Sequence, residues 1–174
     1  MKKNLNLLLF IGVLLISSIT LKAQTDVRMQ SVFIYNFTRL IAWPAEYQNG
    51  DFIIAVYGNS PMIKEIETMA ASKKAGNQNI ISKSFNSADE IDKCHILYVP
   101  SNQSRNLDAI VTSLKVKNIN ALVVSDNRSA ISNGAVINFT VIDNRQRFEL
   151  SQSNAQAMGL NPGSEISRLA IVAD

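Results

Sequence analysis

The sequence predicts an α/β protein, a three-layer sandwich with a mostly parallel sheet, a C-terminal antiparallel hairpin and helices on both faces. Short continuous apolar runs alternate with stretches of helical spacing, as in parallel sheets that are buried on both faces. Near the end of the chain, strand-like runs over 135–142 and 146–150 are separated by three polar residues, a spacing typical of a hairpin. No linker or repeat interrupts 24–174, so we expect a single domain there.

The first 23 residues have the pattern of a secretory signal peptide. Lys2 and Lys3 precede an apolar run over 7–19, and Ala23 is a small residue at a cleavage point before Gln24. A retained membrane anchor is the alternative, although the run is short for a span of about 20 residues. Cleavage removes three of the 17 basic residues and leaves 14 against 14 acidic ones. The mature chain then has no formal net charge, which argues against a nucleic-acid-binding or polybasic membrane-binding surface.

The densest apolar segment of the mature chain, Val27 to Trp43, predicts a helix that ends at Pro44. Asp26 is its expected N-cap, and Pro44 disfavours helical geometry at the preceding residue. Apolar residues cover more of this helix than the narrow stripe of a surface helix. One interpretation is a core helix packed on the sheet. The other is a helix whose second face binds a partner protein through its aromatic residues, which are Phe33, Tyr35 and Trp43.

The middle of the chain alternates strands and helices, which favours parallel strands joined by right-handed crossovers. We expect strands over 52–57, 79–83, 95–99 and 121–124, and helices over 61–70 and 107–114. Ser60 is the expected N-cap of the first of these helices. Ser87 and Glu90 have the spacing of a capping box at a short helical start. After the hairpin, short helices are expected over 153–158, stopped by Gly159, and over 164–170.

Polar turns follow three of the predicted strands at their carboxyl ends. In an open parallel sheet these ends share one edge, where ligands bind in a crevice. Amides at helix N-termini, helped by an arginine, can hold a small polar or anionic ligand there. The alternative is that these turns are ordinary strand–helix connections and caps. The candidate residues are Asn59, Ser60, Ser101, Asn102, Arg105, Asp126 and Arg128.

Little in the sequence indicates catalysis. Cys94 and His95 are adjacent in a predicted strand, so their side chains should point to opposite faces and not form a dyad. One cysteine and one histidine are too few for a zinc site of those residues. No nucleophile elbow, P-loop or dinucleotide-binding motif is present in the sequence. We therefore expect a protein that is not an enzyme and takes no cofactor or metal, with Cys94 buried and inert.

The chain resembles the YfiR family of exported bacterial proteins. The shared blocks include FIYNFTRLIAWP at 33–44 and CHILYVPSNQ at 94–103, with further blocks at 52–61, 121–139, 147–150, 154–160 and 167–170. Their order and spacing span nearly all of the mature chain. The resemblance implies a periplasmic regulatory protein that binds and inhibits the periplasmic sensing domain of an inner-membrane signalling protein, a diguanylate cyclase. Binding would lower cyclic di-GMP and biofilm formation. The resemblance also implies an α/β sandwich that forms homodimers.

Two departures from the family pattern alter these expectations. The best-known members contain cysteine pairs, and only Cys94 matches one of those positions, so disulfide redox sensing is not expected here. Asn161-Pro162-Gly163 stands where the family usually has an apolar residue followed by two serines, and Ser167 replaces a usual leucine, which alters the expected packing of the final helix and any interface that it contributes. The alternative function is a periplasmic small-ligand binding or sensor module that uses the strand-end crevice.

Overall fold

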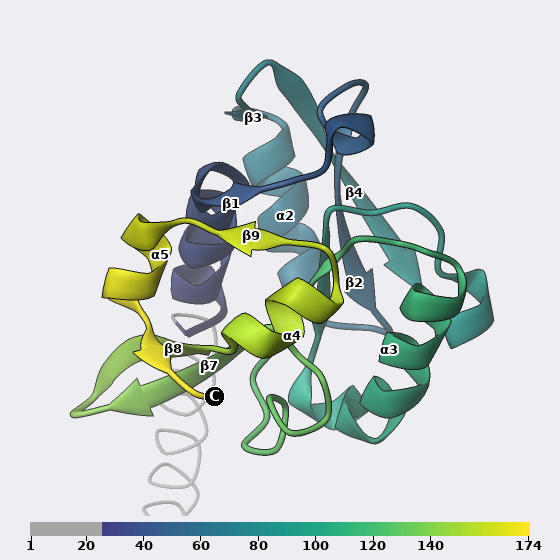
Figure 1. The fold of residues 1–174 in the computed structure, drawn as a ribbon. Helices are drawn as coiled ribbons and strands as arrows, with labels where there is room; N and C mark the ends of the chain where they lie inside the picture. Colours follow the sequence, from purple (N-terminus) through teal and green to yellow (C-terminus); the bar gives the residue numbers. More distant parts are fainter. Residues whose placement is uncertain (1–25) are drawn as a thin grey trace, which may run out of the picture.

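The computed structural model describes residues 26–174, so the predicted signal peptide over 1–23 lies outside the described residues. An eight-stranded, mostly parallel sheet runs through the molecule in the order β10-β8-β7-β6-β5-β2-β4-β3, and helices flank it (Figure 1). The predicted α/β fold class is therefore confirmed. Within 26–174 no helix has the length and apolar character that crossing a membrane requires.

The elements follow one another as the sequence predicts, with additional short pieces. The chain begins with a helix over 26–40, called here the N-terminal helix. It continues through β1 (Ile41–Ala42), η1 (Ala45–Tyr47), β2 (Phe52–Tyr57), α2 (Met62–Ala70), β3 (Lys74–Ala75), β4 (Gln78–Phe85), η2 (Ala88–Glu90), β5 (Ile96–Val99), η3 (Ser101–Asn106) and α3 (Leu107–Val116). It ends with β6 (Leu122–Ser125), β7 (Ile137–Ile142), β8 (Arg145–Leu150), α4 (Gln152–Ala157), β9 (Asn161–Pro162), α5 (Ser164–Leu169) and β10 (Ile171–Val172).

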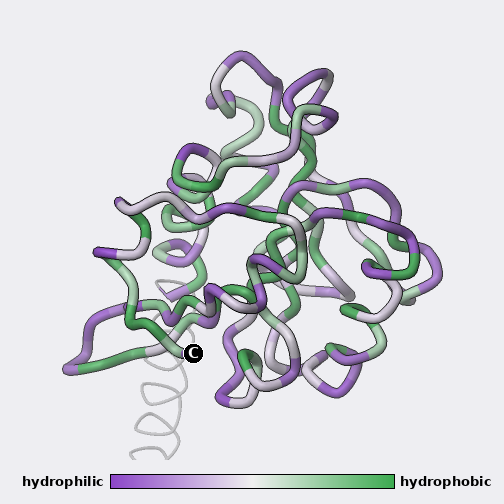
Figure 2. Tube along the Cα trace, in the orientation of Figure 1, coloured by the Kyte–Doolittle hydropathy of each residue, from purple (hydrophilic) through white to green (hydrophobic). Residues whose placement is uncertain are grey.

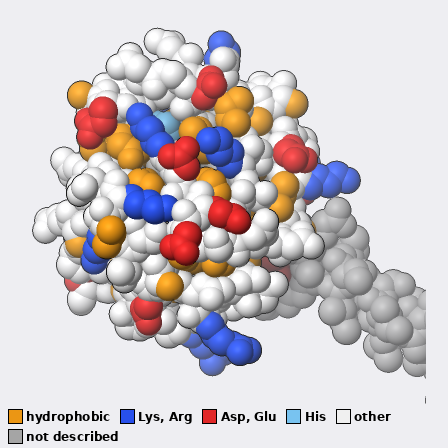
Figure 3. All heavy atoms as spheres, turned by 90° about the vertical axis from the view of Figure 1, so that its right-hand side faces the viewer, with side chains coloured by type: hydrophobic (Ala, Val, Ile, Leu, Met, Phe, Trp, Pro, Cys, Tyr) orange, Lys and Arg blue, Asp and Glu red, His pale blue; other side chains and the backbone are white. Residues whose placement is uncertain are grey.

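Helices cover both faces of the sheet because the crossovers run in opposite directions. From β2 the chain passes through α2 to β4 on one side, and from β5 it passes through α3 to β6 on the other. Right-handed crossovers then place α2 and α3 on opposite faces. Figure 2 shows hydrophobic residues gathered in the central strands, which explains why β5 and β6 are buried throughout. On the face seen in Figure 3, basic side chains lie among acidic ones.

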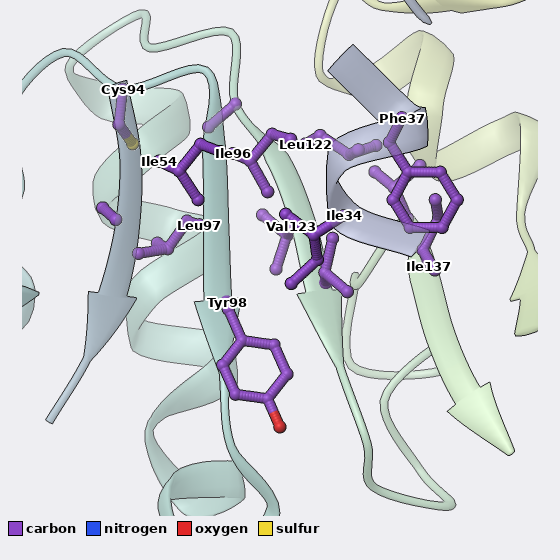
Figure 4. Packing of buried hydrophobic residues seen from close by; sticks show 14 of the residues in the cluster. Ile34, Phe37, Ile54, Cys94, Ile96, Leu97, Tyr98, Leu122, Val123 and Ile137 are labelled. Carbon is purple, nitrogen blue, oxygen red and sulfur yellow. The ribbon is translucent and has the colours of Figure 1, made fainter. Parts of the chain in front are cut away.

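The N-terminal helix packs across the sheet through Ile34 and Phe37, which are 0% and 1% exposed (Figure 4). The helix ends at residue 40, not at Trp43 as predicted, because Ile41–Ala42 pairs antiparallel with β9 and Pro44 keeps the backbone extended. Asp26 is already helical, so its predicted N-cap role is wrong. The prediction of a core helix is confirmed for the face that carries Ile34 and Phe37.

The predicted C-terminal hairpin is confirmed. β7 and β8 pair antiparallel from Ile137↔Leu150 to Ile142↔Arg145. Asp143 and Asn144 form the two-residue turn with φ of 51° and 57°, as a type I′ turn requires. This hairpin extends beyond the rest of the sheet at one edge of the molecule (Figure 1).

Two predicted caps differ in detail. The Ser60 hydroxyl accepts a hydrogen bond from the Met62 amide at 3.3 Å, and α2 begins at Met62. At the predicted capping box, the Glu90 carboxylate accepts from the Asn86 amide at 2.9 Å, and the Ser87 side chain makes no cap hydrogen bond. A capping box requires Glu90 to accept from the amide of Ser87 itself, so the predicted box is not formed at this single 3-10 turn.

Candidate functional site

A groove lies between the N-terminal helix, β8 and α5. Its volume is about 390 Å³. Its floor is apolar and its rim carries one guanidinium and one carboxylate. We call it the aromatic groove, and its lining residues are Phe33, Asn36, Phe37, Arg39, Leu40, Phe148, Glu165 and Leu169.

Aromatic rings make the floor of this groove rigid. The Phe33 ring lies 5.6 Å from that of Phe148 and 6.0 Å from that of Phe139, centroid to centroid. Such tilted and edge-to-face pairs add stability beyond the area that they bury. The opposite wall is formed by Leu169, whose side chain is 54% exposed. An exposed apolar surface with charged groups at its rim is typical of a protein-binding site.

The three residues predicted to bind a partner do not lie together. Phe33 lines the groove, whereas Tyr35 is two residues further along the helix and so about 200° around it. The Tyr35 hydroxyl donates to the Lys74 carbonyl at 3.3 Å, and the Lys73 ammonium lies 4.3 Å from its ring centroid. Trp43 lies beyond the helix and is only 8% exposed. The free protein therefore presents Phe33 at the groove and keeps Trp43 in its core.

Trp43 is buried because its ring belongs to a second aromatic cluster. Its centroid lies 5.1 Å from that of Phe52, edge to face, and 5.9 Å from that of His95. Pro44 turns the chain so that the ring points inward at the start of β2, which a helical pattern does not foresee.

In the strand-end crevice, the structure brings two of the predicted residues into contact. The Asp126 carboxylate accepts a hydrogen bond from the Ser101 amide at 2.6 Å. Ser101 begins η3, so Asp126 takes an amide that an anionic ligand would need. Burial raises the pKa of Asp126, although the Ser101 amide opposes this shift. The Tyr98 hydroxyl also approaches Asp126 and donates to the Gln30 side chain at 3.2 Å.

The remaining crevice residues do not converge with this pair. Asn59, Asn102, Arg105 and Arg128 are exposed, and Ser60 uses its hydroxyl at the start of α2. The polar groups of the crevice thus satisfy one another where they meet. An anionic ligand would have to displace Asp126 from the Ser101 amide.

Cys94 and His95 have structural roles. Burial raises the pKa of the Cys94 thiol to about 12, so the thiolate that a nucleophile requires does not form near neutral pH. The His95 Nδ1 accepts from the Ile53 amide at 3.0 Å, and Nε2 donates to the Tyr47 carbonyl at 2.8 Å. These partners fix the neutral tautomer that carries the Nε2 proton. Across 26–174, no three potential metal ligands of the His, Cys, Asp and Glu types come together.

We expect Cys94 to resist alkylation in the native protein. The side chain is 0% exposed and its thiol is protonated near neutral pH, so both access and reactivity are low. Iodoacetamide treatment followed by intact-mass measurement checks this. The same protein in guanidinium chloride is the control and should be fully modified. Equal labelling rates in buffer and in denaturant would contradict the burial of Cys94.

Of the eight residues that line the aromatic groove, sequence reasoning named only Phe33 as a site residue. Phe148, Glu165 and Leu169 come from segments more than a hundred residues beyond the N-terminal helix. The only signal for Phe148 was its place in a predicted strand, and nothing local indicated which face it would take. The groove exists because the hairpin and α5 both return to the same helix.

Comparison with known proteins identifies the family. The model of the YfiR/HmsC-like family matches residues 27–171, which include every residue of the aromatic groove and of the strand-end crevice. A search of curated proteins finds no match. Members of the matched family are generally regulatory rather than catalytic. The match covers nearly all of the described residues, and the chain therefore belongs to the YfiR/HmsC-like family.

Proposed function

We propose that the protein is a periplasmic regulator that binds the periplasmic sensing domain of an inner-membrane signalling protein and holds it inactive. The target that we propose is a diguanylate cyclase, so that binding lowers cyclic di-GMP and biofilm formation. Membership in the family supports a regulator of a membrane partner. The observation that carries the proposal is the aromatic groove, a preformed apolar surface on a chain whose single cysteine and histidine are both buried.

The groove suits a protein partner for physical reasons. Its floor is already packed, so little conformational entropy is lost on binding. Arg39 and Glu165 carry opposite charges at the rim, and such groups fix the orientation of a partner more than they add affinity. If the sensing domain presents an apolar side chain to Leu169 and Phe33 only in its inactive state, binding shifts the receptor toward that state.

Reconstitution tests the proposal. Membrane vesicles that contain the candidate cyclase are mixed with increasing amounts of the mature chain, and cyclic di-GMP synthesis is measured. We expect saturable inhibition. A cyclase that lacks its periplasmic domain is the control and should be unaffected. Full cyclase activity at saturating amounts of the chain would overturn the cyclase target, and recovery of no membrane receptor after in-cell crosslinking would overturn the regulator itself.

We expect Leu169→Glu to weaken binding of the receptor by about thirtyfold, which corresponds to about 2 kcal/mol. Leu169 is 54% exposed at the wall of the groove, so the substitution places a charge in the interface without disturbing the core. Val116→Glu is the matched control, because Val116 is an exposed apolar residue on α3 and does not line the groove. Equal losses in both variants, measured by biolayer interferometry, would exclude the groove as the binding surface.

We further propose that the chain forms homodimers. Met29 and Val32 are 46% and 47% exposed on the N-terminal helix, one turn before Phe33 and Asn36, and they do not line the groove. They extend the apolar side of the helix beyond the groove and offer surface to a second copy. Light scattering on the mature chain measures its mass and distinguishes dimer from monomer.

The alternative function, a module that binds a small ligand in the strand-end crevice, has no comparable support. The Ser101 amide, which would donate to such a ligand, already donates to the Asp126 carboxylate.

A further inference from the structure

The edge of β8 next to the aromatic groove is open. β8 pairs with β7 along all of its residues, from Arg145 to Leu150. On its other side it pairs with β10 only at Glu149 and Leu150. Among the described residues, no strand therefore lies beside 145–148. The open edge continues the line of β10 toward the tip of the hairpin (Figure 1).

The register decides which backbone groups face outward. The residues that flank a two-residue turn form a hydrogen-bonded pair, so Arg145, Arg147 and Glu149 direct their amides and carbonyls at β7. Gln146, Phe148 and Leu150 direct theirs away from β7. The hydrogen bond from the Ala173 amide to the Leu150 carbonyl at 3.0 Å agrees with this alternation. The register of β10 directs the Ile171 amide at the Phe148 carbonyl, because Ile171 lies opposite Glu149 in a parallel pair. The open edge thus presents the amide and carbonyl of Gln146 and the amide of Phe148 to an incoming strand.

The two faces of this edge differ in chemistry. Phe148 lines the groove, and alternation places Gln146 on the same face, beside Val141, which is 57% exposed. Arg145 and Arg147 are exposed on the opposite face, and neither guanidinium donates a hydrogen bond or forms an ion pair within residues 26–174. A strand added here would have one side toward an apolar groove and the other toward two positive charges.

We propose that the open edge of β8 binds an extended segment of the partner as an added strand. Alternate side chains of that segment are apolar and enter the groove beside Phe148, and the intervening ones are acidic and face Arg145 and Arg147. Such β-addition takes affinity from main-chain hydrogen bonds and specificity from alternate side chains. The inference rests on the proposed function, whose partner it describes.

A second copy of the chain does not fit this edge. Two β8 edges paired antiparallel about a two-fold axis at Gln146, the centre of the open edge, would bring Arg145 of one copy opposite Arg147 of the other. Like charges directly across a strand pair are destabilising. The two arginines therefore select an acidic segment and disfavour edge-to-edge self-association, a role that charged residues often have on edge strands.

The first test uses a synthetic heptapeptide that alternates glutamate and leucine, added to isotopically labelled mature chain. We expect amide hydrogen exchange, followed by NMR, to slow at Gln146 and Phe148, whose amides point outward. A peptide that alternates lysine and leucine should bind about tenfold more weakly. Exchange that slows elsewhere in the chain but not at these two amides would overturn the proposal, and so would equal affinity for the two peptides.

Two variants remove the backbone and the charge contributions separately. Gln146→Pro deletes the outward amide at a position where an edge strand tolerates proline, and Gln146→Ala is its control because it retains that amide. Only Gln146→Pro should lose peptide binding. Reversal of both charges, Arg145→Glu with Arg147→Glu, should make the lysine peptide the tighter ligand. Full binding by Gln146→Pro would overturn the added strand.

The cyclase assay separates this inference from the proposed function. If the chain inhibits the receptor and Gln146→Pro inhibits it equally, the regulator stands and the added strand is wrong. If the chain binds no receptor, the proposed function is wrong, and the peptide measurements still decide whether the edge accepts a strand.

Discussion

Replacement of Phe37 by alanine should lower the free energy of unfolding by about 3–5 kcal/mol. Phe37 is 1% exposed, and its ring centroid lies 5.2 Å from that of Phe148 and 6.1 Å from that of Phe139. The substitution leaves a cavity between the N-terminal helix and the β7–β8 hairpin. Since domains are typically stable by about 5–15 kcal/mol, such a loss is a large fraction of the total.

Urea unfolding measures this effect, with the fluorescence of Trp43, the single tryptophan, as the probe. The control is Val116→Ala. That side chain is 76% exposed, so the variant should differ from the parent protein by no more than about 0.5 kcal/mol. If Phe37→Ala behaves like this control, the N-terminal helix does not pack on the hairpin through its aromatic residues.

The second large effect should appear when pH falls. Burial lowers the pKa of His95 below its ordinary value of 6.5, and the charge of Lys93 lowers it further, while the hydrogen bond to the Tyr47 carbonyl opposes the shift. The folded state therefore holds the neutral ring. The unfolded state takes up a proton below pH 6.5. Stability from this group is complete above that pH and is lost as pH falls below it, at up to about 1.4 kcal/mol per pH unit.

The geometry explains why His95 resists protonation. A proton on Nδ1 would remove the acceptor for the Ile53 amide, 3.0 Å away, and would place a charge on a ring that is 1% exposed to water. Urea unfolding at a series of pH values tests the expectation. His95→Gln is the control, because glutamine retains a donor for the Tyr47 carbonyl but does not titrate. Parallel stability curves for the two proteins would show that another group causes the loss.

The sequence predicts the elements of this fold well wherever the signal is local. β2 coincides with its predicted bounds because an uninterrupted apolar run precedes Gly58, and the hairpin follows from Asp143 and Asn144, which tolerate positive φ. The two-residue strands could not be predicted. Ile41–Ala42 forms the strand β1 only because it pairs with β9. The two segments are far apart in the sequence, so no local pattern predicts this pairing.

The candidate site was predicted in part, for the same reason. Phe33 is apolar at helical spacing and lines the groove, and its role in binding a partner stays a prediction. Phe148 and Leu169 lie beside it only because tertiary packing brings β8 and α5 to the N-terminal helix, which no local pattern predicts. The loop residues Ser101 and Asp126 were expected to serve a ligand, but the structure pairs them with each other. A sequence shows that such groups share one edge, and does not show whether a bound molecule or the chain itself satisfies them.

The pairing of β1 with β9 limits the order in which the elements of this chain can fold. Ile41 lies opposite Pro162, and the N-terminal helix buries its rings against residues 139 and 148. The contact order is therefore high, because the first element is completed by the last ones. If the chain is exported as proposed, the N-terminal helix reaches the periplasm long before the segments on which it packs. Under that proposal its aromatic face stays uncovered until residues 139 and 148 arrive, and exposed apolar surface of this kind is prone to aggregation.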